Sequence, residues 1–271
     1  MDLGLSGKVV IVSGGGSGIG AAISRGALAE GARVAVVTRM TDAAREFQAW
    51  AQQAYAADCL LLEAELAEPE HCQRAISQVA AHFGRIDALV NNAGRNDGVG
   101  LEHGSPERFE AGLRENLLHY YALAHHALPH LKATTGSIVN IASKVALTGQ
   151  GGTSAYAGAK GAQLALTREW AAELLPYRIR VNAVVPAEVM TPLYRDWLDT
   201  FAHPDQKLRS IAANVPLEQR FTTPEEIAAA VLFLLSPTQS AHTTGQHVIV
   251  DGGYVHLDRT LTSKPYEDQE V

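Results

Sequence analysis

Apolar residues along the chain fall into short runs that alternate with longer amphipathic stretches. The short runs are nearly continuous and rich in β-branched residues, as is typical of parallel strands covered on both faces. The longer stretches have the helical period of apolar positions. The pattern predicts strands at 8–13, 33–37, 59–64, 86–90, 137–142, 178–185 and 247–250. It predicts helices at 19–30, 42–57, 69–83, 106–131, 154–175 and 224–235.

This alternation of strands and helices predicts a Rossmann-type α/β fold, a doubly wound parallel seven-stranded sheet with helices on both faces. A chain of 271 residues with 46% hydrophobic content can form such a sheet as a single domain, 1–271. Within it, 187–214 is expected to form a helical flap over the substrate, and 255–271 a polar C-terminal tail.

Charge and cysteine content narrow the classes of partner. The net charge is −7, and no basic run of five or more occurs, which argues against nucleic acid or an anionic membrane. The longest apolar run, 227–235, is far shorter than the ~20 residues that span a bilayer. Cys59, Cys72 and the eleven histidines have no metal-ligand spacing, so no metal site is expected. The first residues do not resemble a signal peptide, so a cytoplasmic location is expected.

A glycine-rich turn, GGGSGIG, lies between the first predicted strand and the first predicted helix. Glycine allows a sharp turn and a close approach to a pyrophosphate, and the helix N-terminus offers free N–H groups and the positive end of its dipole. A strand before the turn and a helix after it are the context that dinucleotide binding requires. The turn therefore predicts a nucleotide site at Gly14, Ser17, Gly18, Ile19 and Gly20.

The ends of the next strands bear on the choice of nucleotide. In this fold an acid at the end of the second strand suits the ribose diol of NAD, and a base there suits the 2′-phosphate of NADP. The chain has Thr38 and Arg39 there, which favours NADP with NAD still possible, although Arg39 could be a solvated loop residue. Further cofactor contacts are expected after the third and fourth strands, at Glu65, Leu66, Asn92, Ala93 and Gly94.

Tyr156 and Lys160 are four residues apart in a predicted helix, so both side chains leave the same face about one turn apart. An ammonium beside a phenol favours the phenolate and lowers the tyrosine pKa from its usual ~10, which predicts an acid/base pair. Such a spacing alone is more often an ordinary surface pair. Ser143, at the end of the fifth strand, can present a hydroxyl to the same volume. Asn116, inside the helix at 106–131, either points outward or serves a polar task.

Five motifs in this order resemble the short-chain dehydrogenase/reductase family over 8–253: Gly14-x-x-x-Gly18-Ile19-Gly20, Asn91-Asn92-Ala93-Gly94, Asn116, Ser143 and Tyr156-x-x-x-Lys160. The resemblance implies that Tyr156 is the general acid/base and that Lys160 holds the nicotinamide ribose and lowers the tyrosine pKa. It implies that Ser143 orients the reacting oxygen and that Asn116 anchors a water for proton relay. It also implies a homotetramer, or a dimer, with the helices of Asn116 and Tyr156 at one interface.

The chain departs from the family after the sixth strand, where the family has Pro-Gly and this chain has Pro-Ala-Glu. Pro186, Val189 and Thr191 are still expected at the cofactor, the last two at the nicotinamide carboxamide. Glu188 adds a carboxylate where the substrate should enter, which suits a polyol better than a fatty acyl or steroid substrate. His119 and His130, on the long helix, are expected at the surface or at an interface.

Within the family, several stretches resemble the bacterial L-fucose dehydrogenases: 91–98, 128–134, 148–151, 163–170, 186–194 and 251–259. This resemblance implies NAD(P)-dependent oxidation of the anomeric hydroxyl of L-fucose, L-galactose or D-arabinose to the lactone. Buried sugar hydroxyls need polar partners, because an unpaired one costs about 1–3 kcal/mol. The candidate substrate residues are Asn96, Lys144, Gln150 and Glu188, with Trp197 or Phe201 against the apolar face of the sugar.

Two other functions remain open on the sequence. An NADPH-dependent ketoreductase for acyl or steroid-like carbonyls keeps the fold but requires an apolar pocket, which Glu188 and Gln150 do not favour. A non-catalytic nucleotide sensor keeps the cofactor site alone. The intact set of Ser143, Tyr156 and Lys160 counts against that function.

Overall fold

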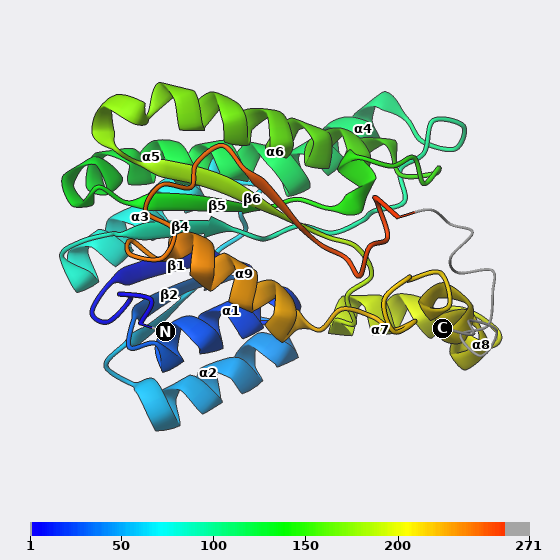
Figure 1. The fold of residues 1–271 in the computed structure, drawn as a ribbon, viewed down its shortest axis with the longest axis horizontal. Coiled ribbons are helices and arrows are strands. Elements are labelled where there is room, and N and C mark those ends of the chain that lie inside the picture. Colours follow the sequence, from blue (N-terminus) through cyan, green and yellow to red (C-terminus); the bar gives the residue numbers. More distant parts are fainter. Residues whose placement is uncertain (1, 258–271) are drawn as a thin grey trace, which may run out of the picture.

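The structure is a computed structural model that describes residues 2–257, and it contains one parallel sheet (Figure 1). The strand order is β3-β2-β1-β4-β5-β6-β7, which confirms the predicted doubly wound fold. The order reverses direction between β1 and β4, and open α/β sheets bind ligands beyond the carboxyl ends of the strands at such a point. The strands are β1 Val9–Ser13, β2 Arg33–Thr38, β3 Cys59–Glu63, β4 Ala88–Asn91, β5 Ser137–Ile141, β6 Arg180–Pro186 and β7 His247–Val250.

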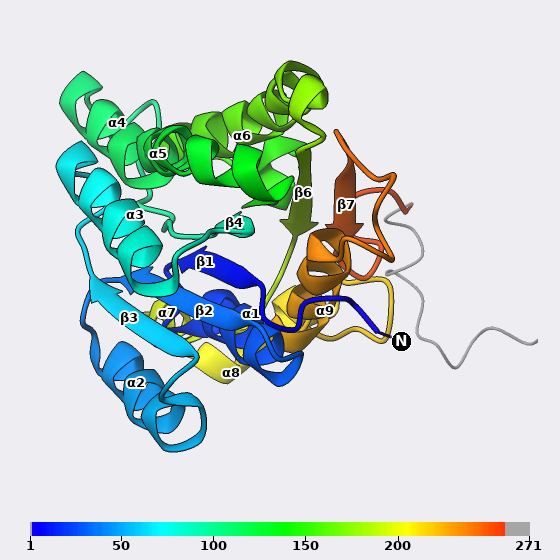
Figure 2. The same cartoon turned by 90° about the vertical axis from the view of Figure 1, so that its left-hand side faces the viewer.

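Helices cover both faces of this sheet (Figure 2). One face carries α1 (Gly18–Ala29), α2 (Asp42–Tyr55) and α9 (Pro224–Leu235). The other carries α3 (Pro69–Phe83), α4 (Pro106–Leu113), α5 (His119–Thr134) and α6 (Ser154–Glu173). Short helical turns occur at η2 Lys144–Ala146 and η3 Leu175–Tyr177. Within residues 2–257, no helix combines the length and the apolar character that crossing a membrane requires.

The central strand β1 explains the continuous apolar run seen in the sequence. Val10 and Val12 pack into the core beneath α1 and α9, whereas Val9 and Ile11 pack into the core beneath α3 and α5. All four are fully buried. Because both faces of the strand are covered, neither set of alternating positions can be polar.

The helix predicted at 106–131 is divided in the structure. A π-helical turn, η1 (Arg114–Leu118), separates α4 from α5. The wide turn contains Asn116, whose side chain is fully buried. Isolated π turns often occur at functional sites, because the extra residue redirects a side chain and loosens the main-chain hydrogen bonds. Apolar periodicity did not predict this break, because 106–131 was interpreted with one continuous helical period.

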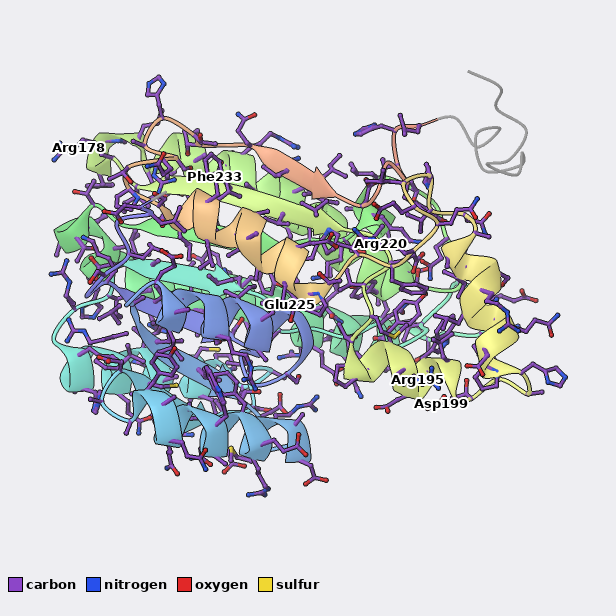
Figure 3. The ribbon with its side chains drawn as sticks, turned by 60° about the horizontal axis from the view of Figure 1, so that its bottom comes forward. Arg178, Arg195, Asp199, Arg220, Glu225 and Phe233 are labelled. Carbon is purple, nitrogen blue, oxygen red and sulfur yellow. The ribbon has the colours of Figure 1, made fainter. Side chains whose placement is uncertain are left out.

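The predicted flap at 187–214 contains two short helices, α7 (Pro192–Leu198) and α8 (Pro204–Ala212), which lie beyond the carboxyl ends of the strands (Figure 1). A single bridge between Val189 and Thr222 joins its base to the segment before α9. Figure 3 shows Arg195 on α7 and Asp199 at its C-cap, and the two form an ion pair of 3.3 Å. Of the tail predicted at 255–271, residues 258–271 lie outside the described part of the chain.

Candidate active site

The glycine turn after β1 is packed so closely that side chains are excluded. Gly14 has φ +64°, and a Cβ there would lie 3.1 Å from the Cα of Ala93. A Cβ on Gly20 would lie 2.2 Å from the Gly14 carbonyl oxygen, well inside contact distance. The turn therefore requires glycine at both positions.

Ser13 and Asn92 fix this turn against the end of β4. The Asn92 side-chain amide donates to the carbonyls of Ser13 at 2.9 Å and Gly14 at 3.3 Å. The Ser13 hydroxyl accepts from the backbone N–H groups of Asn92 at 2.9 Å and Ala93 at 3.1 Å. The sequence prediction included Asn92 but missed Ser13, whose only signal was a polar residue at the end of an apolar strand.

The amino end of α1 is oriented for an anionic ligand. Ser17 is its N-cap, it is exposed, and its hydroxyl caps none of the first N–H groups of the helix. Ile19 packs at the edge of the core and holds the helix against the sheet. These features, with the side-chain-free turn at Gly14 and Gly20, fit the pyrophosphate of a dinucleotide.

The start of the flap meets the same turn. A Cβ on Gly18 would lie 3.2 Å from the Cβ of Thr191, so Thr191 lies directly against the glycine turn. The Thr191 hydroxyl also accepts from the backbone of Tyr194 at 3.2 Å and caps α7. Val189 and Pro186 are buried beside the end of β6. The predicted nicotinamide contacts thus come together at one edge of the sheet.

Arg39 lies at the open end of β2. Its side chain is 61% exposed, and its Nη1 lies 4.0 Å from a carboxylate oxygen of Glu65. The Glu65 backbone N–H donates to His71, and the Leu66 side chain is buried in the core beneath α3. The guanidinium is therefore held only loosely and can reach a ligand near the glycine turn.

The four predicted catalytic residues converge beyond the ends of β4 and β5. A Cβ on Gly94 would lie 2.7 Å from the Asn116 side-chain oxygen and 3.9 Å from the Lys160 Nζ, so these three residues are neighbours. The Lys160 Nζ lies 5.5 Å from the centroid of the Tyr156 ring and donates to the Ile141 carbonyl at 2.7 Å. Lys160 is 2% exposed and Tyr156 is half-buried.

The predicted lowering of the Tyr156 pKa is wrong for this structure. Burial raises the pKa of Tyr156 to about 12, and its hydrogen bond with Ser143 only partly opposes this. Burial also lowers the pKa of Lys160 to about 7. The desolvated ammonium donates to Ile141 rather than to Tyr156, so burial outweighs the attraction between the two groups.

The side-chain amide, the side-chain oxygen and the main-chain carbonyl of Asn116 all have hydrogen-bond partners in the protein. Its side-chain amide donates to the Gly112 carbonyl at 2.9 Å, and its side-chain oxygen accepts from the Arg95 backbone at 2.8 Å. Its main-chain carbonyl accepts from the Gln163 side chain at 2.6 Å. A relay water at Asn116 would have to share these acceptors, and that role stays a prediction.

Lys144 and Glu188, predicted separately as substrate residues, form one ion pair beside Ser143. Each is 8% exposed. The Tyr194 hydroxyl donates to the second oxygen of Glu188 at 2.7 Å, and the Lys144 Nζ lies 4.0 Å from the centroid of the Tyr254 ring. Burial, reinforced by the Glu188 charge, raises the pKa of Tyr194 well above its usual value, so its hydroxyl stays protonated. The sequence prediction missed Tyr194, which lies in the first turn of α7.

The remaining predicted substrate residues are more open. Asn96 is exposed, and its side chain accepts from the Gly98 backbone at 3.1 Å in a local turn. Gln150 is exposed. Trp197 is 45% exposed and stacks edge-on between Tyr194 and Phe201.

The expected surface position of His119 is wrong. The residue is 2% exposed, its Nε2 lies 3.0 Å from the Glu115 carbonyl, and burial lowers its pKa to about 4. The π turn before it rotates α5 so that His119 faces inward. His130 is half-exposed, nearer to expectation.

The chain is similar to known proteins over nearly its whole length. Residues 14–255 match the family described as enoyl-(acyl carrier protein) reductase. The chain is 35% identical over 249 residues to the L-fucose dehydrogenase of Bos taurus, an alignment that covers 92% of this chain and 89% of the bovine protein. It is 44% identical to the Cj0485 dehydrogenase of known crystal structure, with a TM-score of 0.91 and coverage of 96% and 98%. L-sorbose reductase from Gluconobacter frateurii, solved with NADPH and L-sorbose, is 29% identical with a TM-score of 0.89 and coverage of 95% and 100%.

Proposed function

This chain belongs to the short-chain dehydrogenase/reductase family, and we propose that it oxidises the anomeric hydroxyl of a free aldose to the lactone with NAD(P). L-Fucose is the favoured substrate, with L-galactose and D-arabinose as related ones. The observation that carries the proposal is the buried Lys144–Glu188 pair beside Ser143. The pair lines the expected substrate position with polar groups. The likeness to L-fucose dehydrogenase supports a free aldose as the substrate.

The residues around the glycine turn fit a dinucleotide, as the close packing at Gly14 and Gly20 indicates. Gly14, Ser17 and the amino end of α1 would hold the pyrophosphate, and Val189 and Thr191 the nicotinamide. A bound nicotinamide supplies the hydride acceptor.

The protein's own groups would handle the proton. Tyr156 takes the proton of the anomeric hydroxyl while the hydrogen on the same carbon leaves as hydride, so that a carbonyl forms. Ser143 donates a hydrogen bond to the reacting oxygen and keeps it beside the phenol. Lys160, whose pKa burial lowers to about 7, can carry a positive charge beside Tyr156 while the phenol exchanges its proton, and can exchange its own proton at neutral pH.

The Lys144–Glu188 pair suits recognition of neighbouring hydroxyls. A sugar hydroxyl both donates and accepts, and the pair offers an ammonium donor next to a carboxylate acceptor. Tyr194 holds the carboxylate in place, so the arrangement is formed before a substrate binds. Removing one partner would leave a buried charge unpaired, which keeps the two side chains together.

The exposed guanidinium of Arg39 supports NADP as the preferred cofactor, because a 2′-phosphate beyond β2 would meet a weakly held cation. NAD is the alternative, since Glu65 lies close enough to compete for Arg39.

The surface of the long helices supports self-association. Phe109, Leu118 and Tyr121, on α4, η1 and α5, are 39%, 46% and 57% exposed. A homotetramer, or a dimer, that pairs these helices would cover them. Cys59 and Cys72 are free thiols, which fits a reducing cytoplasmic location.

The alternative is an NADPH-dependent ketoreductase for acyl or steroid-like carbonyls. The description of the matched family names an acyl substrate, although for an enoyl reductase. The buried ion pair argues against it, because an acyl chain cannot satisfy either charge. A non-catalytic nucleotide sensor is opposed by the convergence of Asn116, Tyr156 and Lys160.

The experiment is a panel of aldoses and acyl ketones assayed with NAD and NADP in parallel, followed by nicotinamide absorbance. We expect reduction of the cofactor with L-fucose and related aldoses. Turnover of acyl ketones with no response to any aldose would overturn the proposal in favour of the ketoreductase.

A further inference from the structure

The Lys160 side chain is buried, and its amine donates hydrogen bonds to neutral groups of the protein. Its Nζ donates to the Ile141 carbonyl at 2.7 Å and to the Tyr120 hydroxyl at 3.4 Å. The Tyr120 hydroxyl donates to the same Ile141 carbonyl at 3.1 Å. The ammonium, the phenol and the carbonyl therefore form a closed triangle at the end of β5.

Tyr120 and Tyr156 are both close to Lys160 but differ in exposure. Tyr120 is fully buried, whereas Tyr156 is only half-buried. The Nζ lies 5.5 Å from the ring centroid of each tyrosine. Lys160 is thus equally close to two phenols, of which only Tyr156 is partly exposed.

The surroundings of Tyr120 hold its ring and backbone in place. Its ring meets the His119 ring edge-on, with centroids 4.9 Å apart. The Asn91 side chain donates to the Tyr120 carbonyl at 3.4 Å. The π turn places Asn116 one turn before Tyr120, with both side chains buried, and Gln163 ties that turn to α6 through the Asn116 carbonyl at 2.6 Å.

We propose that Tyr120 is a positioning residue for the reaction, whose hydroxyl holds the Lys160 ammonium at the Ile141 carbonyl and keeps it charged beside Tyr156. Neither the sugar assignment nor the cofactor preference enters this proposal. It concerns the residues that prepare Lys160 and applies to any alcohol that Tyr156 deprotonates.

The electrostatics of the site agree with this role. Burial, with the neighbouring Tyr156 charge, raises the pKa of Tyr120 well above its usual value, so Tyr120 remains a neutral hydroxyl. The groups that face Lys160 are Tyr156 from α6, Tyr120 and His119 from α5, and the Ile141 carbonyl from β5. His119 is uncharged above its pKa of about 4. The ammonium therefore depends on the phenol and the carbonyl for its hydrogen bonds.

Removing the Tyr120 hydroxyl should disfavour the charged form of Lys160. The pKa of Lys160, which burial already lowers to about 7, should fall by about 0.5–1 further, as expected for loss of one long hydrogen bond of 3.4 Å and ordinary strength. The form with Tyr156 as phenolate and Lys160 as ammonium would then be about 3–10-fold rarer. The maximal kcat should fall by that factor. The acidic limb of the pH profile of kcat should move to lower pH together with the Lys160 titration.

The test compares Tyr120→Phe with Tyr177→Phe. Tyr177 lies in η3 and is 42% exposed, so it is a control for loss of a tyrosine hydroxyl away from Lys160. The first readout is the titration midpoint of the Lys160 side chain in the substrate-free protein, followed by NMR of ¹³C-labelled lysine. The second is the pH profile of kcat with whichever alcohol the protein turns over, with KM measured alongside.

We expect a lower Lys160 midpoint, a lower kcat and an unchanged KM for Tyr120→Phe, and parent values for Tyr177→Phe. An unchanged Lys160 midpoint would overturn the proposal, and so would a fall in kcat without movement of its acidic limb. A Tyr120→Phe protein that failed to fold would also overturn it, because all ring contacts remain and the hydroxyl would then have a structural role. The NMR readout requires no turnover, so its outcome is separable from that of the sugar panel.

Discussion

Lys144 and Glu188 pair across the carboxyl ends of the neighbouring strands β5 and β6, each with 8% of its surface exposed. Breaking a buried pair from one side leaves an uncompensated charge, whereas replacing both partners by apolar residues is often neutral for stability. The contribution of the pair to stability can therefore be measured separately from its contribution to substrate binding.

Glu188→Leu should lower the free energy of unfolding by about 3–5 kcal/mol, because the Lys144 ammonium is then buried without a partner. Lys144→Met combined with Glu188→Leu should restore most of that stability while kcat/KM for L-fucose stays reduced by about 10-fold or more. Urea unfolding and steady-state kinetics measure the two effects.

The control for that pair is Arg195 and Asp199 on α7, which form an ion pair at 49% and 53% exposure. Their double replacement should change the free energy of unfolding by less than about 1 kcal/mol. If the Lys144 and Glu188 double variant kept the sugar kinetics of the parent, these two side chains would not contact the substrate.

Arg39→Ala should weaken NADP about 10-fold or more and leave NAD nearly unchanged, because only NADP offers a 2′-phosphate to the guanidinium. Fluorescence titration with each cofactor gives the two dissociation constants. Arg45→Ala, on the exposed side of α2, serves as the control for loss of positive charge. Equal weakening of NAD and NADP would contradict the assignment of Arg39.

Gly20→Ala should abolish cofactor binding, because its Cβ would lie 2.2 Å from the Gly14 carbonyl and the turn would have to open. Gly158→Ala in α6 is the matched control, since a Cβ there would meet only the Phe109 ring at 4.0 Å. The control should bind cofactor normally and gain about 0.5–1 kcal/mol of helix stability. Equal cofactor affinity in both variants would show that the turn does not hold the ligand.

Lys160 should make the stability of the protein depend on pH. Its pKa is lowered to about 7 in the folded state from an ordinary 10.5, so the unfolded chain binds more protons between these values. Burying the amine therefore costs stability below pH 7, and the cost disappears as the pH rises toward 10.5. Lys160 should contribute a rise in the free energy of unfolding of up to about 1.4 kcal/mol per pH unit within this window.

Urea unfolding between pH 7 and 9.5 measures that slope and stays below the range in which the tyrosines ionise. Lys160→Met should remove the rise, and Lys132→Met, at an exposed position, should retain it. A parent slope equal to that of Lys160→Met would mean that Lys160 titrates normally.

The fold was predictable because local patterns determine it. The continuous apolar runs at Val9–Ser13 and the other strands required two covered faces, and the strand–turn–helix context identified the glycine turn. The π turn at Asn116 was missed because 106–131 was interpreted with one continuous helical period, although an extra residue shifts the phase of that period by about 100°. The inward position of His119 follows from that turn and was missed for the same reason.

The candidate site could be proposed from the sequence as a set of residues but not as a set of contacts. Tyr156 and Lys160 were found by their spacing, yet the sign of the tyrosine pKa depended on burial, which the sequence does not contain. Lys144 and Glu188 are 44 residues apart and were proposed separately, because only the adjacency of β5 and β6 brings them together. Tyr120 and Tyr194 were missed because aromatic residues in helices usually indicate packing.

The central claim is that Tyr156 moves the proton in a sugar dehydrogenation. The most direct test is the initial rate of NADP and NAD reduction with L-fucose by the parent and by Tyr156→Phe, which removes one hydroxyl and keeps the ring. We predict reduction by the parent and a fall in kcat of about 10²–10⁴-fold in the variant, with cofactor affinity unchanged. Full activity in Tyr156→Phe would contradict the account.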